Sequence, residues 1–157
     1  MLSVYVPTES SLKKLPVPDL AALPESAVWI DLVKPTSEED HAVERLAGIA
    51  VPTREDMQEI EISSRLYIEN GARYMTATLM CHSDTDMPRT TAVTFILTGH
   101  RLVTVRYDEP KPFALVENKL ARSCPSGITG DRPGVRQVAK EQGVVPQRPR
   151  IGRVRGQ

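Results

Sequence analysis

Residues 65–81 read RLYIENGARYMTATLMC, two strand-like runs joined by Asn70 and Gly71. Asn-Gly is the pair that best tolerates the positive φ angles of a type I′ turn, so this stretch predicts a β-hairpin. A second hairpin is predicted from residues 92–97 and 102–107, which are rich in β-branched side chains and flank a turn at 98–100. Two consecutive hairpins indicate a mostly antiparallel sheet.

The residues before the first hairpin predict two more strands. Ser3 to Val6 is a short strand-like run, and a loop punctuated by Pro16, Pro18 and Pro24 separates it from the run 27–32. The second run is continuously apolar until Asp31, which is typical of a buried strand. Pro35 then ends the strand.

Two helix starts follow this buried strand. Thr36 and Glu39 have the spacing of a capping box and predict a helix over Ser37 to Ile49. Its apolar face is expected to contain Val43, Leu46, Ala47 and Ala50. Thr53 and Asp56 have the same spacing, with Asp in place of Glu, and predict a second, short helix over 54–60.

The last predicted element is a helix over Pro112 to Arg122, where Phe113, Val116 and Leu120 recur at helical spacing. The expected order is therefore strand, strand, two helices, two hairpins and a helix. We assign the chain to the α/β class in its α+β-like form, with a largely antiparallel mixed sheet flanked by helical layers.

The charge changes sign along the chain. Residues 1–131 carry 13 Lys and Arg against 19 Asp and Glu, whereas residues 132–157 carry 7 against 1. Beyond Asp131 the sequence has neither a period of 2 nor one of 3.6. We therefore predict one domain at 1–131 and a basic, disordered tail at 132–157.

Composition excludes several classes of function. An acidic domain argues against a nucleic-acid partner, because binding to phosphates needs a basic face. The longest weakly polar run extends only from Thr90 to Gly99, too short to span a bilayer. Cys81 and Cys124 form no CxxC motif and are interpreted as free thiols of a reducing, cytoplasmic compartment. Neither a nucleophile motif nor a glycine-rich phosphate loop is present, so we expect no enzyme.

Carboxylates gather near the starts of the first two helices, and hard divalent cations prefer such oxygen ligands. The set comprises Glu38, Glu39, Asp40, Glu55, Asp56, Glu59 and Glu61. The alternative is that these side chains complement the helix dipoles and have no ligand. Residues 81–86, Cys-His-Ser-Asp-Thr-Asp, also include metal-ligand types, but a solvated loop explains them without a metal.

Several of these segments together resemble a known family. Trp29 to Leu32, then Pro35-Thr36 and Glu38-Glu39, then Glu55 to Met57, are similar to the amino-terminal cytoplasmic domain of CorA-type magnesium transporters. The second hairpin, 95–106, looks like that family too. The resemblance extends from about Ser3 to about Asp131.

The resemblance implies a Mg²⁺-sensing regulatory domain. Such domains form the intracellular funnel of a pentamer in the inner membrane, and Mg²⁺ bound between neighbouring subunits favours the closed pore. Asp56 matches the family's acidic position at that intersubunit site, and Glu55 is its neighbour. We therefore expect weak Mg²⁺ binding at these two residues.

The resemblance also has departures. Val51-Pro52 and Ser63 to Arg65 stand where the family commonly has His-Pro and Arg-Pro-Lys. At Asp131 the family would continue into a long stalk helix, two membrane helices and a Gly-Met-Asn signature. We expect a truncated domain that cannot transport ions, followed by a tail at 132–157 that is not homologous to any part of a transporter. A stand-alone soluble regulatory or interaction module on the same fold remains the alternative.

Overall fold

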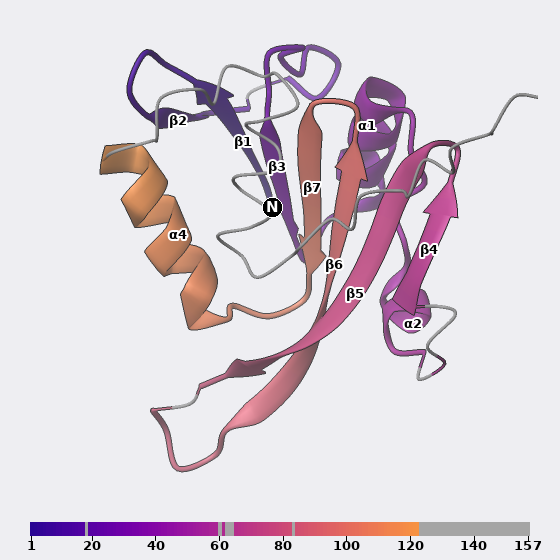
Figure 1. The fold of residues 1–157 in the computed structure, drawn as a ribbon, viewed down its shortest axis with the longest axis vertical. Helices are drawn as coiled ribbons and strands as arrows, with labels where there is room; N and C mark the ends of the chain where they lie inside the picture. Colours follow the sequence, from indigo (N-terminus) through magenta and orange to yellow (C-terminus); the bar gives the residue numbers. More distant parts are fainter. Residues whose placement is uncertain (18, 60, 62–64, 83, 123–157) are drawn as a thin grey trace, which may run out of the picture.

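The structure is a computed structural model that describes residues 1–17, 19–59, 61, 65–82 and 84–122. Its centre is one seven-stranded sheet with the strand order β2-β1-β3-β7-β6-β5-β4 (Figure 1). The strands are β1 (Leu2–Pro7), β2 (Leu12–Leu15), β3 (Trp29–Val33), β4 (Leu66–Glu69), β5 (Ala72–Cys81), β6 (Arg89–Thr98) and β7 (Arg101–Arg106). Neighbouring strands are antiparallel except β3 and β7, which are parallel. The predicted largely antiparallel mixed sheet is confirmed.

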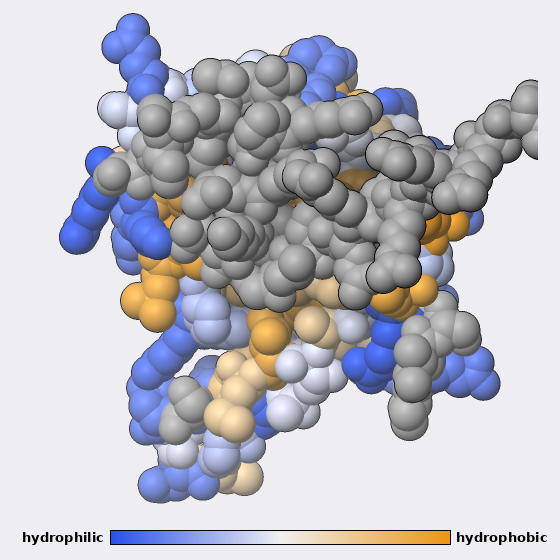
Figure 2. Space-filling model, viewed as in Figure 1, coloured by the Kyte–Doolittle hydropathy of each residue, from blue (hydrophilic) through white to orange (hydrophobic). Residues whose placement is uncertain are grey.

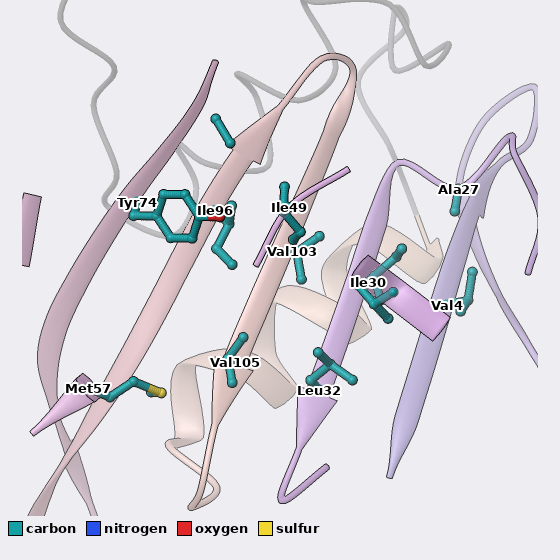
Figure 3. Close-up of a cluster of buried hydrophobic side chains, with 12 residues drawn as sticks. Val4, Ala27, Ile30, Leu32, Ile49, Met57, Tyr74, Ile96, Val103 and Val105 are labelled. Atoms are coloured by element: carbon teal, nitrogen blue, oxygen red, sulfur yellow. The ribbon is translucent and has the colours of Figure 1, made fainter. Parts of the chain in front are cut away.

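Helices cover both faces of the sheet, as the sequence predicted. Helices α1 (Ser37–Ala47) and α2 (Arg54–Met57) lie behind the sheet in Figure 1, and α4 (Lys111–Arg122) lies in front of it. On the first face, Val43 and Met57 pack with apolar side chains of the central strands. Figure 3 shows this cluster, with Ile30, Val103 and Ile96 on adjacent strands. On the second face, Phe113 and Leu120 of α4 pack with a separate cluster.

Both predicted hairpins are present. Asn70 and Gly71 have φ angles of 49° and 79°, as a type I′ turn requires, and Glu69 pairs with Ala72 on either side of them. The second turn is shorter than expected, because Thr98 pairs with Arg101 and only Gly99 and His100 lie between them. Strand β6 is longer than predicted, since it begins at Arg89, and β7 is shifted by one residue, since it ends at Arg106 and not at Tyr107.

One strand in the amino-terminal half was not foreseen, and the first helix differs in detail from its prediction. Strand β2 was not predicted, because Leu12-Lys13-Lys14-Leu15 has no alternation and forms a strand only through its pairing with β1. Helix α1 ends at Ala47 and not at Ile49, because Gly48 takes a left-handed φ of 65° and caps it. Ala50 therefore lies outside the helix and is exposed, whereas Ala42 takes a buried position on the helix.

Some expectations lie outside the described residues. These are the predicted tail at 132–157, the last residues of the predicted domain from 123 to 131, Cys124 and Ile60. The second helix was predicted to reach Ile60 but ends at Met57, with Gln58 as its C-cap. Helix α4 confirms the predicted helix and begins one residue earlier, at Lys111. Over the described ranges, none of the helices combines the length and the apolar character that crossing a membrane requires.

Candidate metal centre

The residue nominated as a cation ligand, Asp56, lies in the single turn of α2. Thr53 caps this turn: its hydroxyl accepts from the Asp56 backbone N at 3.2 Å. In return, Asp56 Oδ2 accepts from the backbone N and the hydroxyl of Thr53, at 2.9 and 2.8 Å. The predicted capping box is confirmed. Buried Met57 then fixes the turn against the sheet.

These bonds also determine the charge state of Asp56. The side-chain and backbone hydrogen bonds from Thr53 favour the carboxylate and hold the pKa of Asp56 below its usual range. The side chain is exposed, so its charge faces solvent. Asp56 is therefore a fixed, fully ionised carboxylate at neutral pH.

Glu55 and Asp56 raise the pKa values of two different tyrosines. The pKa of Tyr107, at the end of β7, is raised by burial and by the charges of Asp40 and Glu55. The pKa of Tyr67 on β4 is raised by burial, by Tyr74 and Glu69, and also by Asp56. Although Glu55 and Asp56 are adjacent in sequence, their charges therefore act on different tyrosines, Glu55 on Tyr107 and Asp56 on Tyr67.

Two carboxylates of α1, Glu39 and Glu44, hold the local backbone through hydrogen bonds. Glu39 Oε2 accepts from the backbone N of Thr36 at 2.9 Å and completes the first predicted capping box. Glu44 accepts from the backbone N of Val51 and contacts His41, each at 2.9 Å. Asp40 differs from these two, because its buried Oδ1 has no hydrogen-bond partner among the described residues. Burial, Glu44 and Glu39 together raise the pKa of Asp40.

The loop after β5 contains ion pairs between protein side chains. His82 Nε2 lies 3.1 Å from Arg89 Nη2 and 3.6 Å from Asp108 Oδ1. Asp84 pairs with Lys111 at 2.9 Å. Cys81 is buried, and burial raises the pKa of its thiol. Within the part of the chain that the structure describes, no three His, Cys, Asp or Glu residues come together to hold a metal ion.

Sequence reasoning missed two buried arginines that organise the fold. Arg106 pairs with Asp31 between the sheet and α4, and Thr104 links Asp31 to Trp29. Arg101 donates to three backbone carbonyls, those of Glu25, Ala27 and Leu46. The sequence did contain a sign of buried charges: a charged residue stands at each end of the apolar run RLVTVR, and another stands inside WIDLV.

The sequence of the chain is similar to those of several magnesium transport proteins. The chain is 28% identical over 133 residues to the magnesium transport protein CorA of Campylobacter jejuni. It is 30% identical over 115 residues to the protein of the same name from Escherichia coli K12. The resemblance to CorA is confirmed. No family model matches the chain.

Solved CorA structures share the architecture. The soluble domain of CorA from Methanocaldococcus jannaschii matches 90% of this chain and 55% of that chain, with a TM-score of 0.62 and 17% identity. The complete CorA structure from the same organism matches 76% of this chain and 37% of that chain, with a TM-score of 0.55 and 19% identity.

The chain spans less than half the length of these curated CorA proteins. The alignments cover 78% of the chain but 41% of the Campylobacter protein, and 73% of the chain but 36% of the Escherichia coli protein. The similarity therefore concerns one part of a CorA protein.

Proposed function

We propose that the chain is the cytoplasmic, Mg²⁺-sensing domain of a CorA-like divalent-cation transporter, with a regulatory and not an enzymatic role. The observation that carries the proposal is the combination of a CorA-like fold with an exposed carboxylate that stays ionised. Asp56 is held in place by Thr53 on the surface of that fold. Such a group can donate an oxygen to Mg²⁺ without first losing a proton.

The proposed site is completed by a second subunit. Mg²⁺ requires near-octahedral oxygen coordination and gives up its waters reluctantly, so one carboxylate binds it only weakly. Asp56 supplies the first ligand and Glu55 a weaker neighbouring charge. The neighbouring copy in a homo-oligomer, a pentamer in our proposal, supplies the remaining protein oxygens. Binding between subunits would then hold a transporter's pore closed.

We further propose that this chain does not conduct ions by itself. A pore needs spanning helices of about 20 apolar residues, and the longest weakly polar run in the sequence is Thr90 to Gly99. Expressing the chain in a bacterium that lacks its magnesium transporters should leave growth at low Mg²⁺ unrestored. Restored growth would contradict this part of the proposal.

The Mg²⁺ role can be tested by titrating the isotope-labelled chain with MgCl₂ and following its backbone amides by NMR. We expect weak, saturable shifts at residues 53–57 in the millimolar range. Asp56→Asn should abolish them, because it removes the charge while its amide oxygen can still accept from Thr53. Glu38→Gln is the matched control, since Glu38 is an exposed first-turn carboxylate on α1.

Two results would contradict the proposed site. One is a tight, stoichiometric Mg²⁺ site that survives Asp56→Asn. The other is an equal loss of shifts in the Asp56 and Glu38 variants, which would indicate nonspecific attraction to an acidic surface.

A further inference from the structure

The two edge strands of the sheet, β2 and β4, differ in how well they are protected from pairing with another chain. Unpaired backbone groups at a sheet edge can pair with another chain, and natural proteins block them with lysines or with a covering element. The β2 edge has both devices. Lys13 and Lys14 are exposed, and Lys14 Nζ lies 3.1 Å from Glu117 Oε1 on α4. Helix α4 thus lies beside that edge (Figure 1).

The β4 edge has neither lysine nor proline. Leu66 and Ile68 are 66% and 70% exposed, unusually open for large apolar residues in a strand. In Figure 2, hydrophobic surface appears at the right of the molecule, where Figure 1 places β4. Among the described residues, β4 pairs with β5 alone.

The hairpin determines which backbone groups of β4 face outward. In a two-residue hairpin the residues flanking the turn form a hydrogen-bonded pair, and such pairs then alternate along the strand. Glu69 and Ala72 flank the turn, so Glu69 and Tyr67 direct their backbone groups toward β5. The N–H and C=O groups of Leu66 and Ile68 consequently point to the open edge.

We propose that this edge pairs with β4 of a second copy of the chain, antiparallel and centred on Tyr67. A two-fold axis perpendicular to the sheet would place Leu66 of each copy opposite Ile68 of the other. Each such pair can exchange two backbone hydrogen bonds and joins two exposed apolar side chains on the same face. The two sheets would become one continuous sheet.

The charges flanking β4 fit this register. Centring on Tyr67 places Arg65 of each copy opposite Glu69 of the other, which gives two ion pairs across the interface. Arg65 is already held on the appropriate face, because its Nε donates to Glu59 O at 3.1 Å and its Nη1 to Thr78 Oγ1 at 3.2 Å. Glu69 alternates onto the face of Tyr67, which stacks on Tyr74 with ring centroids 4.5 Å apart. The segment 65–69 is therefore complementary to itself in both charge and shape.

The first test is the mass of the full chain by analytical ultracentrifugation, at concentrations up to about 1 mM because small interfaces are weak. The experiment includes EDTA, so that its outcome is independent of the Mg²⁺ proposal. We expect the weight-average mass to rise toward twice that of the chain. Ile68→Lys should weaken the association by at least about tenfold, because it places a charge in the apolar pair. Met87→Lys is the control, since Met87 is 83% exposed but lies outside the β4 edge.

The second test checks the register by disulfide trapping in a Cys124→Ser background. Tyr67 residues facing each other in a non-hydrogen-bonded pair would have Cα atoms about 4.5 Å apart, within disulfide range. Tyr67→Cys should therefore give a covalent dimer on mild oxidation. Leu66→Cys should not, because its two copies would be diagonal neighbours about 7–8 Å apart.

The third test reverses the charges of Arg65 and Glu69, which flank the proposed apolar pairs. Glu69→Arg and Arg65→Glu should each weaken self-association, whereas an equimolar mixture of the two variants should form heterodimers with both ion pairs restored. Circular dichroism of each variant confirms that it is folded. A chain that remains monomeric over the whole concentration range overturns the proposal. So does a dimer that Ile68→Lys leaves intact, or one that traps equally well through Leu66→Cys.

Discussion

Arg106 on β7 and Asp31 on β3 form a buried ion pair across the one parallel junction of the sheet, with Nη2 2.8 Å from Oδ2. Arg106 Nε also lies 3.2 Å from both carboxylate oxygens, so the contact is multidentate. The guanidinium lies 4.4 Å from the ring centroid of Phe113, which belongs to α4. The pair therefore connects the centre of the sheet to the helix that covers it.

Removing one partner of this pair should destabilise the fold strongly. Asp31→Ala leaves a buried guanidinium without its counter-charge, and we expect a loss of about 3–5 kcal/mol in the free energy of unfolding. The double variant Asp31→Leu/Arg106→Met should be more stable than Asp31→Ala, because no buried charge remains. Urea unfolding measures both. The exposed pair Lys14–Glu117 is the control, and Lys14→Ala should cost less than about 1 kcal/mol. Equal losses at the two pairs would contradict the argument.

Thr53 should control the ionisation of Asp56. Thr53→Ala removes the hydroxyl that donates to Asp56 Oδ2, so the pKa of Asp56 should rise toward its ordinary value. Thr53→Ser keeps the hydroxyl and should leave the pKa low. Carboxyl-carbon NMR titrations of the three proteins would measure this. If the alanine and serine variants titrate alike, the hydroxyl is not the cause of the depressed pKa.

Asp40 should lower stability at neutral pH. Its folded-state pKa is raised by burial and by Glu44 and Glu39, so the neutral carboxyl is the form that favours folding. That contribution is complete below the unfolded pKa of about 3.9 and is lost as the pH rises through the folded pKa. Asp40→Asn should therefore raise the free energy of unfolding at pH 7, with a gain that shrinks toward pH 4. Glu44→Gln should do the opposite, since the pKa of Glu44 is lowered. A gain for Asp40→Asn that does not change with pH would exclude the charge as its source.

Local signals made most of the fold predictable, and non-local pairing explains the rest. Asn70-Gly71 and the two capping boxes were recognised because each acts within four residues. Strand β2 escaped because its four residues form a strand only against β1. The parallel pairing of β3 with β7 joins residues about 70 positions apart, such as Trp29 and Leu102, which no local pattern encodes.

The candidate site was predictable to a smaller extent. The carboxylate of Asp56 and its cap were identified from sequence, and the structure shows their geometry. The assignment of Mg²⁺ to Asp56 and Glu55 remains a prediction, because a second subunit would supply the other ligands. Arg101 and Arg106 were not recognised, since burial of a charged residue depends on partners distant in sequence.

Arg101 gives a prediction that separates backbone hydrogen bonding from ion pairing. Its guanidinium donates to the carbonyls of Ala27 and Leu46 at 3.0 and 3.3 Å, and to both the carbonyl and the carboxylate of Glu25. The Arg101 side chain is 7% exposed, whereas that of Glu25 is 84% exposed, so the ion pair is well solvated. Solvated ion pairs contribute little to stability, while buried charge-assisted bonds to carbonyls contribute more.

Arg101→Lys should lower the free energy of unfolding by about 2–3 kcal/mol, because lysine cannot reach all these acceptors. Glu25→Gln should cost less than about 1 kcal/mol in the same urea unfolding experiment. If the glutamine variant is instead the more damaging of the two, the ion pair with Glu25, and not the carbonyl network, is the main contribution of Arg101 to stability.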